Sequence, residues 1–151
     1  MTTNYDNLSA REIDARVAER VFGYRVEMIR LNCYPNPMVK CFINPHGLID
    51  FSDDGKSQNA MMYRNRKDAT DGIAEPLPAW STDIAAAFLV VEKMRERGFV
   101  WSFNCRDALG LKRWYVKVDW PSDWIDSTDA ILPRAIAVGA LRAVEEDLER
   151  C

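Results

Sequence analysis

Apolar residues recur with helical spacing in three separate stretches of the chain, and the first of these lies at residues 10–22. Its apolar stripe consists of Ile13, Val17 and Val21. Ser9 is followed three positions later by Glu12, a pattern typical of a capping box. The sequence therefore predicts a helix that begins just after Ser9 and ends before a glycine at position 23.

Two later stretches predict further helices, at residues 84–97 and from about residue 130 to 148. Ser81 or Thr82 can cap the earlier one, because their hydroxyl oxygens accept hydrogen bonds from free N–H groups. Asp83 falls in its first turn, where the helix dipole favours a negative charge.

Alternation of apolar and polar residues predicts strands at 99–105 and 113–119, joined by a hairpin loop at 106–112. We interpret residues 120–124 as a turn that leads into the last helix. A weaker alternation at 24–31 permits another strand.

Between the first two helices, residues 38–43 and 48–51 flank an Asn-Pro-His-Gly turn and predict a short hairpin. The following residues, 52–78, carry turn-forming residues and little periodicity. A loop of this length is uncommon in a compact domain and is often a lid, a binding loop or an insertion.

The order of elements predicts an α+β fold: an α-β-α sandwich in which a small, mostly antiparallel sheet is covered by helices. A long loop or insertion separates the first helix from the second. With 151 residues, the chain has the length of one domain, so we assign 1–151 to a single sandwich domain with a variable insertion at 25–79.

Composition narrows the cellular setting. No apolar run approaches the length of a membrane span, and residues 1–6 lack the pattern of a secretory signal, so we expect a cytoplasmic protein without membrane contact. The four cysteines show no close pair, consistent with a reducing compartment. The net charge of −3 makes nucleic acid an unlikely partner, because binding to a phosphate backbone usually needs a basic protein.

Common catalytic motifs do not occur in the sequence. The single histidine, His46, lies in the predicted Asn-Pro-His-Gly turn, so we expect no catalytic residue, no bound metal and no cofactor. Three carboxylates close together, Asp50, Asp53 and Asp54, leave a metal-dependent hydrolase as an alternative, although turn formation also explains them.

The start of the second helix is the best candidate for a binding site. Free N–H groups and two hydroxyls there can hold an anion, and Trp80 can stack on a base. The prediction also includes two arginines of the long loop, Arg64 and Arg66. It further includes Arg113 and Tyr115, which share one strand face with Lys117. The predicted ligand-binding residues are Trp80, Ser81, Thr82, Asp83, Arg64, Arg66, Arg113 and Tyr115.

Residues 80–99, from Trp-Ser-Thr-Asp-Ile to Arg-Gly-Phe, resemble the phage ABA sandwich domain family. Residues 11–19 with Gly23 resemble the opening helix of that family, and residues 130–141 its closing helix. The resemblance covers about half of the chain; residues 25–79 depart from it. It implies an α-β-α sandwich and a phage origin, and it implies no reaction, because a fold does not determine function.

Three functions are therefore compatible with the sequence. The first is a non-enzymatic phage accessory protein that binds or sequesters a small nucleotide-like ligand, with an anti-defence role against host signalling. The second is a factor that docks on a host or phage protein, and the third is the metal-dependent hydrolase. Self-association into a homo-oligomer is compatible with each of them.

Overall fold

The computed structural model describes residues 3–30, 38–43, 49–51, 74–120 and 123–150, and the chain divides into two compact units. The first unit comprises residues 1–21 and 79–151, and the second comprises residues 22–78. The second unit nearly coincides with the segment that the sequence marks as an insertion at 25–79. Each unit is considered by itself.

The first unit contains helices and one antiparallel sheet. Its elements are α1 (Ala10–Arg20), α3 (Ile84–Glu96), β5 (Val100–Ala108), β6 (Leu111–Trp120), β7 (Asp123–Asp129) and α4 (Leu132–Arg150). The sheet has the strand order β5-β6-β7, and both pairings are antiparallel. The predicted α+β class, with a small antiparallel sheet packed against helices, is confirmed.

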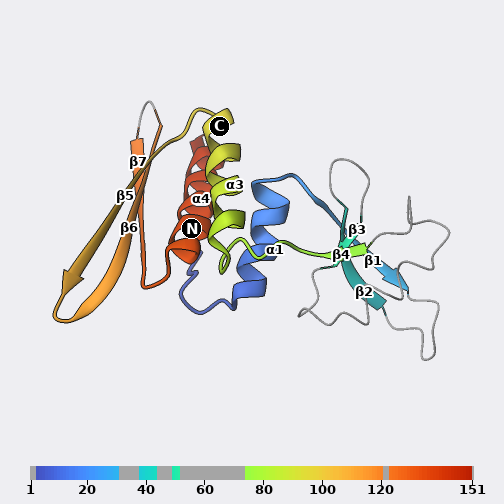
Figure 1. The fold of residues 1–151 in the computed structure, drawn as a ribbon. Coiled ribbons are helices and arrows are strands. Elements are labelled where there is room, and N and C mark those ends of the chain that lie inside the picture. Colours follow the sequence, from blue (N-terminus) through green and yellow to red (C-terminus); the bar gives the residue numbers. More distant parts are fainter. Residues whose placement is uncertain (1–2, 31–37, 44–48, 52–73, 121–122, 151) are drawn as a thin grey trace. The chain divides into compact units, whose positions relative to one another are not determined.

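Helix α4 lies at the centre of this unit, between the sheet and α1, with α3 packed beside it (Figure 1). Its apolar residues are buried around most of its circumference, as is typical of a helix enclosed on several sides. The fully buried ones are Ala135, Ile136, Ala137, Ala140, Leu141 and Ala143. The hydrophobic core of the unit therefore surrounds α4.

One face of the sheet rests on the helices. Gly139 of α4 lies against it: a Cβ added at this glycine would be 3.4 Å from Ser127 Cβ and 3.5 Å from a Val118 methyl carbon. Phe88 of α3 contacts Phe103 of β5 on the same face. Within the described part of the first unit, the helices that contact this sheet all do so on this face, so no helix of this unit covers the opposite face, which we call the open face.

The predicted capping of α1 is confirmed. Ser9 accepts a hydrogen bond from the backbone N–H of Glu12, and the Glu12 carboxylate accepts one from the backbone N–H of Ser9. The capping of α3 differs from the prediction. Its N-cap is Asp83, whose carboxylate accepts from the N–H of Ala86, and the helix begins one residue later than a cap at Thr82 requires and two later than a cap at Ser81 requires.

Two features of the sheet were not predicted. The hairpin turns at Leu109 and Gly110 alone, which have φ angles of 54° and 76°, so β5 and β6 extend through most of the predicted 106–112 loop. The second is β7: residues 123–129 form a strand where the sequence predicted the end of a turn and the approach to the last helix. Its inward face carries the polar residues Ser127 and Asp129, which hides the usual alternation.

The second unit is a sheet with the strand order β1-β2-β3-β4. Its strands are β1 (Arg25–Arg30), β2 (Met38–Ile43), β3 (Ile49–Phe51) and β4 (Ala74–Pro76). The predicted hairpin of β2 and β3 is confirmed. The short strand β4 pairs in parallel with β3 and corrects the prediction that residues 52–78 are loop throughout.

Several sequence candidates cannot be placed. His46, Asp53 and Asp54 lie outside the described residues. Asp50 pairs through its backbone in β3. Among the described helices, none has the length and apolar character needed to cross a membrane.

Candidate functional site

The open face of the β5-β6-β7 sheet carries the polar and aromatic side chains of alternate residues on each strand. Strand register places Arg106 beside Arg113, Asn104 beside Tyr115 and Thr128, and Ser102 beside Lys117 and Asp126. We call each such row of neighbouring residues across the strands a rung. The next rung consists of Val100, Asp119 and Trp124. The prediction that Arg113 and Tyr115 share a strand face with Lys117 is confirmed.

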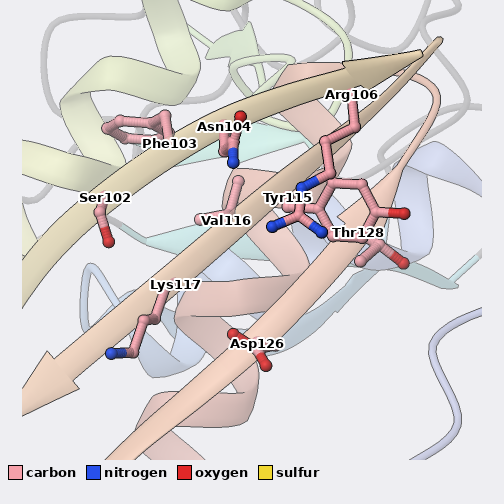
Figure 2. Close-up of a pocket in the computed structure, with 9 residues that line it drawn as sticks. All are labelled: Ser102, Phe103, Asn104, Arg106, Tyr115, Val116, Lys117, Asp126 and Thr128. Atoms are coloured by element: carbon pink, nitrogen blue, oxygen red, sulfur yellow. The ribbon is translucent and has the colours of Figure 1, made fainter. Parts of the chain in front are cut away.

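A shallow pocket of about 580 Å³ lies on this face (Figure 2). Its polar lining comes from all three strands: Ser102, Asn104, Arg106, Tyr115, Lys117, Asp126 and Thr128. Phe103 and Val116 contribute to its floor, and strand alternation directs their side chains toward the helices, where Val116 is buried. Because the sheet is packed against α4, the floor of the pocket is part of the hydrophobic core.

Two cation–aromatic pairs mark this face. The guanidinium carbon of Arg106 lies 5.1 Å from the centre of the Tyr115 ring, and the two side chains overlap in Figure 2. The ammonium nitrogen of Lys117 lies 5.2 Å from the centre of the Trp124 ring. Aromatic rings and guanidinium planes both stack on nucleic-acid bases, so each pair offers a flat contact surface for a planar ligand.

The charges of this face are of both signs. Arg106, Arg113 and Lys117 are positive, whereas Asp119 and Asp126 are negative. Lys117 forms an ion pair with Asp119 at 3.2 Å, with both side chains partly exposed, so this pair is screened by water. The face therefore favours a small anion beside the arginines rather than a long stretch of phosphates.

Arg106 and Trp124 belong to this face but were not among the residues predicted from the sequence. The sequence prediction places Arg106 in a loop and Trp124 in a turn, because it ends β5 at Cys105 and does not include β7, so it misses the strand pairing that brings both residues to this face. Among the described residues, no group of His, Cys, Asp and Glu side chains is arranged to hold a metal ion.

The predicted site at the start of α3 has a different environment. Trp80 and Ser81 are each 1% exposed, and so lie in the core of the unit. The backbone N–H of Ser81 donates to the Asp14 carboxylate at 2.8 Å, and those of Thr82 and Asp83 donate to the carbonyl oxygen of Ala79. These three N–H groups therefore have partners within the protein.

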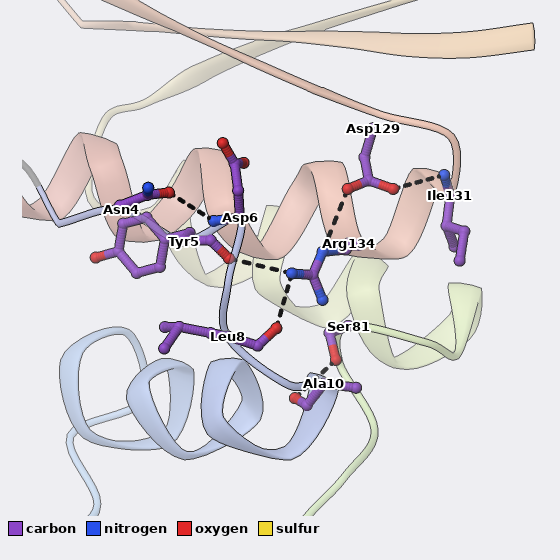
Figure 3. Close-up of polar contacts among 9 residues, drawn as sticks. All are labelled: Asn4, Tyr5, Asp6, Leu8, Ala10, Ser81, Asp129, Ile131 and Arg134. Atoms are coloured by element: carbon purple, nitrogen blue, oxygen red, sulfur yellow. Dashed lines mark hydrogen bonds and ion pairs between the residues drawn. The ribbon is translucent and has the colours of Figure 1, made fainter.

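The acceptor of the Ser81 N–H, Asp14, is itself part of the core. It is fully buried in α1 and accepts hydrogen bonds from the Ser81 backbone and, at 3.2 Å, from Arg11. Burial raises the pKa of the Asp14 carboxyl, although the bonds from Ser81 and Arg11 oppose this shift. The Ser81 hydroxyl donates to the carbonyl oxygen of Ala10, so Ser81 joins α1 to the segment before α3 (Figure 3).

A neighbouring arginine fixes the N-terminal segment. Arg134 of α4 donates to the carbonyl oxygens of Tyr5 and Leu8 at 3.1 and 2.9 Å, and its Nε lies 3.2 Å from a carboxylate oxygen of Asp129 (Figure 3). These contacts connect the N-terminal segment, α4 and the end of β7. The surroundings of the α3 start are thus joined by internal polar contacts.

The other residues predicted to bind the ligand fall into three pairs. Thr82 and Asp83 are exposed, and the Asp83 side chain caps α3. Arg64 and Arg66 lie outside the described residues. Arg113 and Tyr115, in contrast, lie together on the open sheet face.

Comparison with known proteins identifies a similar fold. No family model matches the chain, and no curated protein matches it. The crystal structure of a phage protein from Bacillus cereus ATCC 14579 superposes with a TM-score of 0.55 at 17% sequence identity. The similarity covers 95% of this chain and 99% of the other, and at this identity it shows a shared fold.

Proposed function

We propose that this protein is a phage-encoded, non-enzymatic binding module that holds a nucleotide-like ligand on the open face of the β5-β6-β7 sheet. The observation that carries the proposal is the Arg106–Tyr115 pair, which lines a pocket of about 580 Å³ on an uncovered sheet. A base can stack on this pair, and Arg106 and Arg113, which lie side by side next to Tyr115 on the same face, can bind its phosphate.

The chemistry of the pocket suits capture rather than turnover. Its side chains are hydroxyls, an amide, cations and one carboxylate, and none of the lining residues is a histidine or cysteine. General acid–base catalysis needs a positioned group that titrates near the working pH. Tight capture of a nucleotide signal would lower its free concentration, and this is how such a protein would act against a host defence.

Two resemblances support a phage origin. The Bacillus cereus protein of similar fold is described as a phage protein, and the resemblance of residues 80–99 to the phage ABA sandwich family points in the same direction. With a phage origin, the protein would act in the cytoplasm of a bacterial host.

The test is calorimetric titration of the purified protein with the four 5′-mononucleotides. We expect at least one to bind, and Tyr115→Ala and Arg106→Ala each to weaken it about fivefold or more, in line with the measured contribution of a stacked base. Tyr115→Phe keeps the ring and should bind nearly as well. Arg95→Ala removes an exposed arginine of α3 and serves as the matched control for charge.

Two outcomes would contradict the proposal. One is that no mononucleotide and no dinucleotide binds at millimolar concentration. The other is that binding is unaffected by both Tyr115→Ala and Arg106→Ala, which would place the ligand elsewhere.

A second candidate function is docking on another protein, and exposed apolar residues on α3 favour it. Ile84 and Phe88 lie one helical turn apart and are each 44% exposed, and Leu89 is 52% exposed. Apolar patches of this kind often mark protein interfaces. Sedimentation analysis of wild type and Phe88→Ser would test the simplest case, self-association: a homo-oligomer that dissociates in the variant would support it, and a monomeric wild type would exclude it.

A further inference from the structure

The open face carries two stacking positions rather than one. Besides the Arg106–Tyr115 pair, Trp124 projects from the same face of β7 with its side chain 55% exposed and Lys117 beside its ring. Trp124 lies outside the pocket lining and is not needed for a mononucleotide bound at Tyr115. A large exposed tryptophan on a polar strand face is a natural second contact for an aromatic ligand.

Strand register fixes the spacing of the two positions. Trp124 is opposite Asp119, four residues along β6 from Tyr115. Four residues of a strand span about 13 Å, at a rise of about 3.3 Å per residue. Stacked rings lie within about 4.5–7 Å of each other, so a base stacked on the Tyr115 ring leaves the second position, about 13 Å along the face, free for another base.

The rung between the two positions carries a cation. Ser102, Lys117 and Asp126 form this rung, with Lys117 in the central strand. Arg106 and Arg113 form the rung beyond Tyr115. Along the face, the order is therefore two arginines, an aromatic ring, a lysine and a second aromatic ring.

We infer that the ligand of this face contains two bases joined by a phosphodiester, with one base at Tyr115 and the other at Trp124. The inference rests on the proposed function and names the ligand class of the same site. The terminal phosphate lies beside Arg106 and Arg113, and the bridging phosphate lies over the rung of Lys117. Asp119 and Asp126 oppose the second phosphate, so stacking contributes more to affinity than charge does.

The inference is tested by comparing AMP with the linear dinucleotide pApA in calorimetric titrations of the whole protein. We expect pApA to bind at least about tenfold more tightly than AMP, which corresponds to one additional stacked base. Trp124→Ala should reduce pApA binding to the level of AMP and leave AMP unchanged. Trp124→Phe keeps a stacking ring and should retain most of the gain.

A free dinucleotide and a stretch of single-stranded nucleic acid both contain two bases joined by a phosphodiester. A single-stranded hexanucleotide, A6, distinguishes between them. Binding of A6 as tight as that of pApA assigns the site to a stretch of single-stranded nucleic acid, and much weaker binding of A6 assigns it to a free dinucleotide.

Equal affinity for AMP and pApA would overturn the inference, as would a Trp124→Ala variant that weakens both ligands alike. In either case a site for mononucleotides would remain. Absence of all binding would overturn the proposed function itself.

Discussion

Replacing Asp14 tests the buried contact between α1 and the segment before α3. Asp14→Ala leaves the backbone N–H of Ser81, a residue only 1% exposed, without the acceptor that it now has at 2.8 Å. A buried donor left without a partner costs about 1–3 kcal/mol, and loss of the charged hydrogen bond from Arg11 adds to this. We therefore expect Asp14→Ala to lower the free energy of unfolding by about 2–4 kcal/mol.

Asp14→Asn separates the hydrogen bond from the charge. The amide oxygen of Asn can still accept from the Ser81 N–H, so the loss at neutral pH should be smaller than for Asp14→Ala. Because burial raises the pKa of the Asp14 carboxyl in the folded protein, folding favours its protonated form. The stability that comes from protonated Asp14 is fully present below the pKa of this carboxyl in the unfolded chain. It is lost as the pH rises through the folded-state pKa.

Urea unfolding of wild type and Asp14→Asn from about pH 4 to pH 7 measures this effect, since an unfolded Asp titrates near 3.9. The stability of wild type relative to Asp14→Asn should fall as the pH rises. Asp6→Asn, at an exposed aspartate, is the control and should change stability by less than about 0.5 kcal/mol. An Asp14→Ala loss below about 1 kcal/mol, or a relative stability of wild type that rises with pH, would refute the reasoning.

Further substitutions at four positions test the local structure by the same unfolding measurements. Ser9→Ala should cost about 1 kcal/mol. The hydrogen bonds from Ser9 lower the pKa of Glu12. The contribution of Glu12 to the free energy of unfolding should therefore be present at neutral pH and lost as the pH falls through that lowered pKa. A Glu12→Gln variant as stable as wild type at neutral pH would count against this. Leu109→Asn should stabilise by about 1 kcal/mol, because the fully exposed leucine has a left-handed backbone that asparagine adopts more easily, and an unchanged midpoint would contradict it. Gly139→Leu should cost about 2 kcal/mol or more, since even a Cβ there lies 3.4 Å from Ser127, whereas Gly139→Ala should be tolerated.

The elements with strong local signals were predictable from the sequence. The capping box at Ser9 and the apolar periods of the helices depend on residues close together in the chain, and they identified α1 and α3 to within a few residues. Strand β7 was missed for a physical reason: its inward position Ser127 is a polar residue that is buried against Gly139 of the following helix, α4. Strand and helix approach closely where these two small residues meet, and the alternation of β7 by itself does not reveal this contact.

The site was only partly predictable. The Trp80-Ser81-Thr82-Asp83 segment has the residues of an anion site, but the sequence cannot show that Asp14, 67 positions away, already accepts the Ser81 N–H. The surface that remains open depends on which face of the sheet α4 covers. Alternation alone shows that Tyr115 and Lys117 share a face, and only packing shows that this face is uncovered.

The most direct test of the central claim is an amide NMR titration of the protein with AMP and pApA, because it locates a ligand without any substitution. Binding on the open sheet face predicts shifts at Asn104, Tyr115 and Thr128 with AMP, extending to Trp124 with pApA. The amides of Ser81 and Thr82 should remain unchanged. Shifts confined to the start of α3, or none on β5, β6 and β7, would contradict a ligand site on this sheet.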